Sequence, residues 1–399
     1  MFYQDDNITL YNDNCLNVLK TFQDNSIDSI ISDPPYQLSG ITKSDKRPNQ
    51  PFARTQARKG FLNKEWDVLP SIEIWQECFR VLKPGAFSFF MTTPRQDSLC
   101  QILTDLLQVG FNMRFSSLYF AYAAGFPKAM NLSKAVDEKL GFEREVIGES
   151  KHPIGSEQAK IIDGCYTYSP KPALEIILVC QKPLKYKTNV DQAIDYANQK
   201  MEKGVSDVQC GGVWFNDCRM PTSEDLSVIR DGSKKLDTNK QGWGFKAVSR
   251  GNEGRFPANL ICSDDILNNE QKNFFIHQKN PDSFSRFFDL DEWFCEKIKE
   301  LPLEVQKVFP FLTVPKPSTS EKNIGCKDKN LHPTCKPIAL FSYLVTLATR
   351  YNEIVLDPFL GSGTCGIASK MLGRKFIGIE LEKDYIKIAK DRILFLKGR

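Results

Sequence analysis

The sequence predicts an α/β fold in which helices cover both faces of a doubly wound, mostly parallel sheet. Short apolar runs rich in β-branched residues alternate with segments of helical periodicity, an order that is typical of parallel sheets. The alternation is found near both ends of the chain. With 399 residues, of which 41% are hydrophobic and 26% are charged, the chain has the composition of a globular protein with a substantial core.

The first set of alternating elements occupies the N-terminal half. Residues 15–22 have helical periodicity, and residues 26–32 form an apolar run. Because proline interrupts a strand, this strand is expected to end at Asp33, directly before Pro34 and Pro35. Further expected elements are a helix near 74–82, a strand at 86–91, a helix at 99–107, and strands at 116–121 and 174–180.

The middle of the chain has a different character. From about residue 185 to 330, Gly, Pro, Asn, Asp and Lys are frequent and no periodicity is sustained, which indicates an inserted, irregular region. We therefore predict three segments, 1–184, 185–330 and 331–399, of which the first and last form one domain. In the last segment we expect a helix at 338–349, a strand at 353–356, a glycine loop, a helix to Leu372, a strand at 376–379 and a helix from about Lys383.

Composition excludes several classes of protein. No CxxC pair occurs among the twelve cysteines, and His152, His277 and His332 are far apart, so we expect reduced cysteines and no metal site. The N-terminus lacks a signal-peptide pattern and no apolar run is long enough to span a membrane, which predicts a soluble, cytoplasmic chain. The net charge of +4 is too small to identify a polyanionic partner.

A glycine loop at residues 357–366 (DPFLGSGTCG) follows a predicted strand and precedes a predicted helix. Gly361, Gly363 and Gly366 satisfy GxGxxG, which permits a tight turn and close approach of the backbone to a ligand, as in Rossmann-like folds. The lysine of a phosphate-binding P-loop is absent, which disfavours ATP. Glu380 ends the next strand, 19 positions after Gly361, where a carboxylate accepts hydrogen bonds from ribose hydroxyls. These features fit both NAD and S-adenosylmethionine (SAM).

The order of the elements predicts a circular permutation. Only 33 residues follow Gly366, which is enough for one more strand and two helices. A sheet whose first strand leads into the glycine loop must therefore take its remaining strands from the N-terminal half. The cofactor half of the fold then lies at the end of the chain.

A second motif, Asp33-Pro34-Pro35-Tyr36, follows a predicted strand, and the carboxyl ends of strands line the ligand crevice in open α/β sheets. The amino nitrogen of a base is a poor nucleophile because its lone pair is conjugated into the ring. Hydrogen bonds to the Asp33 carboxylate and the Pro34 carbonyl would favour the tetrahedral nitrogen that attacks, and Tyr36 would stack on the base. The alternative is an ordinary proline turn without a catalytic role.

The two motifs, in this order, resemble those of the β-class amino DNA methyltransferases. In that family the DPPY motif precedes, and the SAM-binding glycine motif follows, a target-recognition domain. Residues 332–337 (HPTCKP) are similar to the HPTxKP motif, which lies near the methionine part of SAM, and residues 12–15 (NDNC) are similar to the segment that meets its adenine. Taken alone, His332 is equally explained as a structural residue and Asp13 as a helix N-cap.

The resemblance implies SAM as the cofactor and Asp33, Pro34, Pro35 and Tyr36 as the catalytic residues. The residues that it assigns to the cofactor are Asp13, Cys15, Asp33, His332, Thr334, Lys336, Asp357, Pro358, Phe359, Gly361, Ser362, Gly363, Thr364, Glu380 and Leu381. Residues 125–128 (GFPK) and Asn131 also resemble the family, without an assigned role.

The activity implied is methylation of N6 of a flipped-out adenine in double-stranded DNA. Methylation of N4 of cytosine is the nearest alternative, and that group more often has serine in place of Asp33. Methylation at C5 of cytosine needs a cysteine after proline, and none of the twelve follows one. A nicotinamide oxidoreductase would leave the DPPY motif unexplained, and a DNA-binding protein without catalysis is a third alternative. Implied partners besides DNA are a second copy of the chain and a cognate restriction endonuclease.

Basic residues that follow the DPPY motif suit phosphate contact beside the flipped base, although a solvated loop explains them equally well. They are Lys43, Lys46, Arg47, Arg54, Arg58, Lys59 and Lys64, against only Asp45 and Glu65 between residues 37 and 66. The middle region carries aromatic and basic residues that, as a group, are a source of base contacts, although each of them taken singly is more often an ordinary surface or core residue. These are Trp214, Arg219, Arg230, Trp243, Arg250 and Arg255.

Overall fold

The computed structural model describes most of the chain in two compact units. One unit comprises Met1–Ala121 and Leu174–Arg399, and the other comprises Tyr122–Ala173. The described residues are 1–36, 67–122, 129–144, 155–170, 173–222, 254–262, 288–306, 319–326, 330, 332 and 334–395. No helix within these ranges is both long and apolar enough to cross a membrane.

The larger unit is built on one sheet, which has nine strands within the described residues. Its centre is parallel: β2, β9, β8, β3 and β4 all run in the same direction. Antiparallel pairing occurs only between β1 and β2, β4 and β6, and β6 and β5 among the described strands. The strands in sheet order are β1 (Tyr3–Gln4), β2 (Ile8–Asn12), β9 (Lys375–Glu380), β8 (Ile354–Asp357), β3 (Ser29–Ser32), β4 (Phe87–Thr92), β6 (Leu174–Gln181), β5 (Leu118–Ala121) and β7 (Leu260–Cys262).

The strand order confirms the predicted permutation. β8, which leads into the glycine loop, pairs on one side with β9 and on the other with β3 from the N-terminal half, where Ile30 lies opposite Leu356. β2 joins the far side of β9, with Ile8 opposite Phe376. The chain therefore changes direction across the sheet between β8 and β3, and open α/β sheets bind their ligands at such a point.

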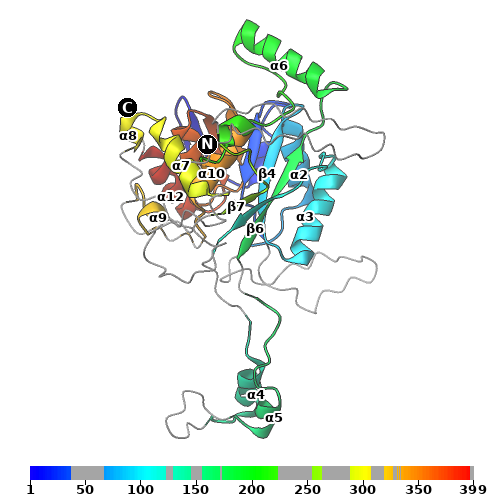
Figure 1. Cartoon of the computed structure of the whole chain (residues 1–399), viewed down its shortest axis with the longest axis vertical. Coiled ribbons are helices and arrows are strands. Elements are labelled where there is room, and N and C mark those ends of the chain that lie inside the picture. The colour runs from blue at the N-terminus through cyan, green and yellow to red at the C-terminus, as the bar shows by residue number, and fades with distance from the viewer. Residues whose placement is uncertain are drawn as a thin grey trace, which may run out of the picture. The chain divides into compact units, whose positions relative to one another are not determined.

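Helices cover both faces of this sheet (Figure 1). On one face lie α1 (Cys15–Leu19), α2 (Ile72–Val81) and α3 (Gln96–Val109), which share a hydrophobic core with β3 and β4. Trp75 of α2 is completely buried there and packs edge-on against Phe90, with ring centroids 5.0 Å apart. The other face carries α7 (Leu290–Lys299), α10 (Ile338–Ala348), α11 (Thr364–Met371) and α12 (Lys383–Leu394).

Helix α10 is buried along its whole length, because it lies between the sheet and further helices. Its sequence, IALFSYLVTLA, has no polar face, as expected for such a position. α11 follows the glycine loop and packs between α10 and α12. The shorter described helices of this unit are α8 (Leu303–Gln306), α9 (Thr319–Lys322) and the 3₁₀ helix η2 (Phe215–Cys218).

The periodicity in the sequence predicts the central strands and helices but not every element. It gives no indication of β2, although Ile8 and Leu10 are fully buried on one side of that strand. It also misses α6 (Asn189–Lys203), which begins at the Thr188 N-cap and lies within the stretch expected to be irregular. β7 adds a strand from the same stretch to the edge of the sheet.

The smaller unit, Tyr122–Ala173, contains α4 (Leu132–Leu140) and α5 (Glu157–Ile161). The buried Asp137 carboxylate of α4 organises it, because it accepts hydrogen bonds from the Ser156 hydroxyl (2.5 Å) and from Arg144 Nε (2.6 Å). Asn131, which resembles a family residue, is the N-cap of α4 and accepts from the Lys134 backbone N–H. Residues 125–128 lie outside the described residues.

Candidate active site

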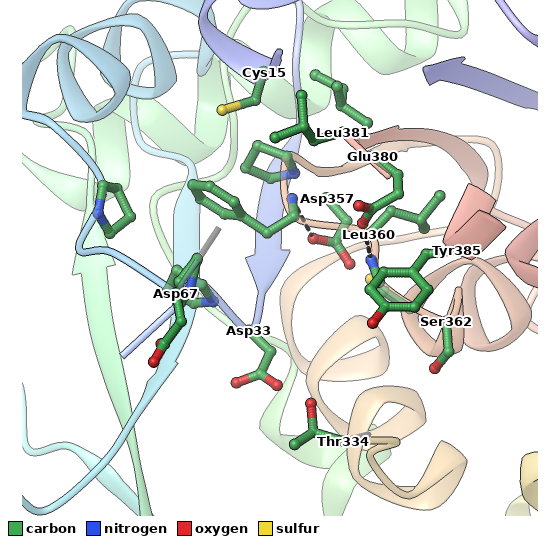
Figure 2. A pocket seen from close by; sticks show the side chains of 18 of the residues that line it. Cys15, Asp33, Asp67, Thr334, Asp357, Leu360, Ser362, Glu380, Leu381 and Tyr385 are labelled. Carbon is green, nitrogen blue, oxygen red and sulfur yellow. Dashed lines mark hydrogen bonds between the residues drawn. The ribbon is translucent and has the colours of Figure 1, made fainter. Parts of the chain in front are cut away.

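A cavity of about 430 Å³ lies where β8 and β3 end side by side. Segments from distant parts of the chain surround it: those that follow β2 and β3, the residues before α2, the segment before α10, and the loops that follow β8 and β9 (Figure 2). A volume of this size lies within the range of small-molecule sites, roughly 300–1,000 Å³. The cavity thus stands at the position that the fold favours for a ligand.

The glycine loop forms one wall. Gly361 lines the cavity with a φ of +52°, and a Cβ atom there would stand 3.0 Å from His332 Nε2. Gly363 does not line the cavity. It has a φ of +82° and packs against α12, where a Cβ atom would lie 2.9 Å from Ala389. The two glycines therefore serve different purposes: Gly361 brings the backbone to the cavity, and Gly363 lets the loop turn into α11.

Glu380, the last residue of β9, connects this strand to the glycine loop. One oxygen of its carboxylate accepts from the Gly361 N–H (2.8 Å) and the other accepts from the Glu382 N–H (2.8 Å). Burial raises the pKa of Glu380 to about 7 in spite of these bonds. Each oxygen keeps a further lone pair for a ligand hydroxyl.

Asp357 ends β8 and is buried beside the cavity. Its carboxylate accepts from the Ser32 hydroxyl (2.5 Å), which ties β8 to β3, and from the Phe359 N–H (3.1 Å). Burial, with the nearby charges of Asp33 and Glu380, raises the pKa of Asp357 to about 7. Two buried carboxyl groups, Asp357 and Glu380, therefore lie on this wall of the cavity.

Asp33, Pro34, Pro35 and Tyr36 all line the cavity. The Asp33 side chain extends from the end of β3 toward its interior (Figure 2). The Tyr36 hydroxyl donates to one oxygen of the Asp33 carboxylate, and Lys336 Nζ lies 3.0 Å from the other. The Tyr36 carbonyl accepts from the Ser98 hydroxyl of α3 (2.9 Å), which anchors the turn. Burial and the charge of Asp33 raise the pKa of Tyr36, so the phenol remains a donor.

His332, Thr334 and Lys336 approach from the segment before α10. The His332 ring packs edge-on against Tyr385, with centroids 4.5 Å apart, and its Nδ1 accepts from the Thr334 N–H (3.3 Å). Burial lowers the pKa of His332 to about 4, so the ring is neutral at physiological pH. It forms an uncharged wall beside Gly361.

Asp13 and Cys15 also line the cavity. The N-cap of α1 is Asn14, whose side chain accepts from the Leu16 N–H (2.9 Å), so the N-cap explanation for Asp13 is wrong. The Asp13 carboxylate instead accepts from the Asn14 N–H (2.6 Å) and from the Asn17 amide (3.3 Å). Burial raises the pKa of the Cys15 thiol to about 12.

Several lining residues belong to no motif that the sequence analysis identified. Asp67, Leu69 and Ser71 precede α2, and Asp67 faces the cavity from the side opposite the glycine loop (Figure 2). Their only signal in the sequence is a polar, proline-containing stretch before a helix. Further such residues are Val68, Pro70, Ile74, Phe341, Ile379 and Tyr385. Within the described residues no group of His, Cys, Asp and Glu has the arrangement of a metal site.

Of the residues considered for DNA contact, those that the structure describes do not line this cavity. Trp214 is stacked by the Arg350 guanidinium at 3.7 Å, and Arg219 donates to the Gly254 carbonyl (3.2 Å) and lies over Phe256. Arg255 pairs with Met220 through backbone hydrogen bonds. The others lie outside the described residues: Lys43, Lys46, Arg47, Arg54, Arg58, Lys59, Lys64, Arg230, Trp243 and Arg250.

Comparison with known proteins matches a family model to most of the chain. The family model described as DNA methylase, for N6 and N4 methyltransferases, matches residues 27–391. The type II methyltransferase M2.LlaDCHI of Lactococcus lactis subsp. cremoris is 53% identical over 62 residues, which are 16% of this chain and 23% of the relative. M2.DpnII of Streptococcus pneumoniae is 50% identical over 62 residues, with the same coverage. These matches thus span less than a quarter of each relative.

Among solved structures, the M1.HpyAVI–SAM complex covers 96% of this chain and 99% of its own, at 16% identity and a TM-score of 0.39. The family model is the match that decides, because it extends over most of the sequence and includes both the DPPY turn and the glycine loop. The chain belongs to the family of N6 and N4 DNA methylases, which use SAM as the methyl donor.

Proposed function

We propose that this protein is a DNA methyltransferase that transfers a methyl group from SAM to N6 of an adenine flipped out of double-stranded DNA. The observation that carries the proposal is the meeting of Asp33 and the glycine loop around one cavity. The ends of two adjacent parallel strands hold them, although Asp33 and Gly361 are more than 300 residues apart in sequence. An acceptor for a base amino group thus faces a site suited to a cofactor.

The charges of the cavity favour SAM over a nicotinamide dinucleotide. Asp13, Asp33, Asp67, Asp357 and Glu380 line it, with Lys336 as the one lysine or arginine among the described lining residues. A sulfonium cofactor with an ammonium group is attracted to such a surface, whereas a pyrophosphate is repelled by it. Gly361 permits close backbone approach, and Glu380 is placed to accept ribose hydroxyls, so the residues fit SAM.

The catalytic turn would activate the target nitrogen by accepting both amino hydrogens, one at the Asp33 carboxylate and one at the Pro34 carbonyl. This removes the nitrogen lone pair from conjugation and directs it at the donor. When bound, SAM supplies a methyl carbon whose bond to sulfur breaks, with its electron pair left on sulfur, as the nitrogen lone pair forms the new bond. Asp33 then receives the proton that the cationic nitrogen releases. Positioning and electrostatic stabilisation supply most of the rate.

Adenine is favoured over cytosine because the residue before the two prolines is Asp33. In the resembling family, serine at this position is more often associated with N4 of cytosine. Both amino groups present the same two hydrogens, so the geometry of the turn serves either base. The rest of the base pocket decides between them.

Product analysis tests the proposal directly. DNA from a methylase-free host that expresses this chain is digested to nucleosides and analysed by mass spectrometry, with a host expressing the Asp33→Ala variant as the control. We expect N6-methyladenine with the wild-type chain only. N4-methylcytosine would replace the adenine assignment by cytosine, and the absence of any methylated base from a folded, SAM-binding protein would refute methyl transfer to DNA.

We further propose that residues 185–330 recognise the target sequence, that the basic residues between 37 and 66 contact phosphates, and that the chain acts in the cytoplasm. A homodimer and a cognate restriction endonuclease are proposed as partners from the same family resemblance. Footprinting on the methylated sequence, with Lys43 and Arg47 replaced by alanine, measures the phosphate contacts. Sedimentation of the purified chain measures its oligomeric state.

A further inference from the structure

The side-chain ammonium of Lys336 contacts the DPPY turn. Its Nζ is 3.0 Å from the Asp33 carboxylate, 3.1 Å from the Glu175 carboxylate and 3.1 Å from the Tyr36 hydroxyl oxygen. Glu175 belongs to β6, a strand that carries no motif. The side chains are mostly buried: Lys336 is 12% exposed, Glu175 19% and Asp33 20%.

A lysine ammonium has three N–H donors and no acceptor. Lys336 Nζ donates hydrogen bonds to the Tyr36 hydroxyl oxygen and to the Glu175 carboxylate, and it forms an ion pair with the Asp33 carboxylate. The ammonium group therefore contacts the catalytic turn directly.

We propose that Lys336 and Glu175 are positioning residues that hold the Asp33 carboxylate in its reactive orientation and charge state. The inference rests on the proposed methyltransferase function and extends it to two residues outside the DPPY motif. Both oxygens of Asp33 are fixed, one by the Tyr36 hydroxyl and the other by Lys336. Glu175 fixes the Lys336 ammonium from β6.

The charges explain why two carboxylates share one lysine. A lone Lys336–Asp33 pair would be neutral and would have little attraction for a nitrogen that becomes cationic during methyl transfer. With Glu175 ionised, the three groups carry one net negative charge within a few ångströms of that nitrogen.

The test compares Lys336→Met, Lys336→Arg and Glu175→Gln with the wild-type chain. SAM affinity is measured by calorimetry, and kcat, KM for DNA and the pH dependence of kcat are measured with labelled SAM. Lys336→Met is expected to lower kcat about 100-fold, the effect of misplacing a reacting group by about an ångström. SAM affinity should stay unchanged, and Lys336→Arg should restore part of kcat because the positive charge returns.

The two charge-removing variants should move the pH profile in opposite directions. Loss of the positive charge beside the catalytic turn should move the acid limb of kcat to higher pH in Lys336→Met, by about one unit or more. Without the competing carboxylate, Lys336 interacts more fully with Asp33, so the acid limb moves to lower pH in Glu175→Gln. A purely structural role of either residue would shift neither limb.

Lys83→Met is the matched control, because Lys83 also forms a buried ion pair, 2.6 Å from Asp28, and those side chains are 13% and 5% exposed. Asp28 lies just before β3, at the strand end opposite Asp33. This variant should lose stability and keep the wild-type pH profile. Weakened SAM binding in Lys336→Met with an unchanged kcat at saturating SAM, or acid limbs that do not move, would overturn the inference. Absence of methyl transfer by the wild-type chain would instead refute the proposed function itself.

Discussion

Replacing Glu380 with glutamine should stabilise the protein at alkaline pH while it weakens SAM binding. Burial raises the pKa of Glu380 from 4.5 to about 7. At 1.36 kcal/mol per unit, ionisation of this side chain costs the folded state about 3 kcal/mol. The cost is absent below the unfolded value of 4.5, grows as the pH rises to 7, and is fully present above it.

Glutamine is neutral at every pH, so Glu380→Gln removes this cost. It also loses one acceptor, because the carboxylate receives both the Gly361 and the Glu382 N–H groups, and an amide has only one oxygen for them. That loss is worth about 1 kcal/mol. At pH 8 the variant should therefore be more stable than the wild type by about 2 kcal/mol, and at pH 5 the two should differ by about 1 kcal/mol or less.

Urea unfolding at pH 5 and pH 8, without SAM, measures these differences. Glu382→Gln is the comparison, since the charge of Glu382 adds to the burial that raises the pKa of Glu380, so its removal should give a smaller pH dependence in the same direction. Calorimetry at pH 8 should show SAM affinity reduced about 10-fold or more in Glu380→Gln, the value of a hydrogen bond to a charged acceptor. An equal offset from wild type at both pH values would refute the burial argument, and unchanged SAM affinity would refute the ribose contact.

Two other predictions concern the glycine loop and the cavity thiol. Gly363→Ala should destabilise the protein by about 2 kcal/mol or more, because a positive φ is combined with a clash against Ala389. Gly204→Ala, at a position with a φ of +72° and open space, should cost only about 1 kcal/mol. Urea unfolding compares the two variants. Burial raises the pKa of Cys15 to about 12, so this thiol should resist iodoacetamide at pH 8 while the exposed Cys100 is alkylated. Peptide mass spectrometry measures both reactions. Labelling of Cys15 before Cys100 would contradict the burial of Cys15.

Local patterns in the sequence account for the centre of the fold. β3 and β8 are short runs rich in β-branched residues, and both end at an Asp-Pro pair. β3 ends at Ser32, directly before Asp33 and Pro34, and β8 ends at Asp357, directly before Pro358. Strand identity and strand end depend on neighbouring residues, so they can be read without the tertiary structure.

Contacts between distant parts of the chain depend on sheet register, which no local pattern encodes. β2 has an ordinary composition, and only its place beside β9 brings Asp13 and Cys15 to the cavity. Asp67 is a lining residue because of where α2 packs, and Glu175 reaches Lys336 because β6 joins the sheet beside β4.

The sequence by itself determined the α/β class, the two motifs and their permuted order, because these follow from periodicity and from residues adjacent in the chain. Which groups face one another follows only from the tertiary structure: Glu380 faces the Gly361 N–H, and the Lys336 ammonium faces Asp33 and Glu175. The physical reason is that the partners of a charged side chain are set by the packing of strands far apart in sequence.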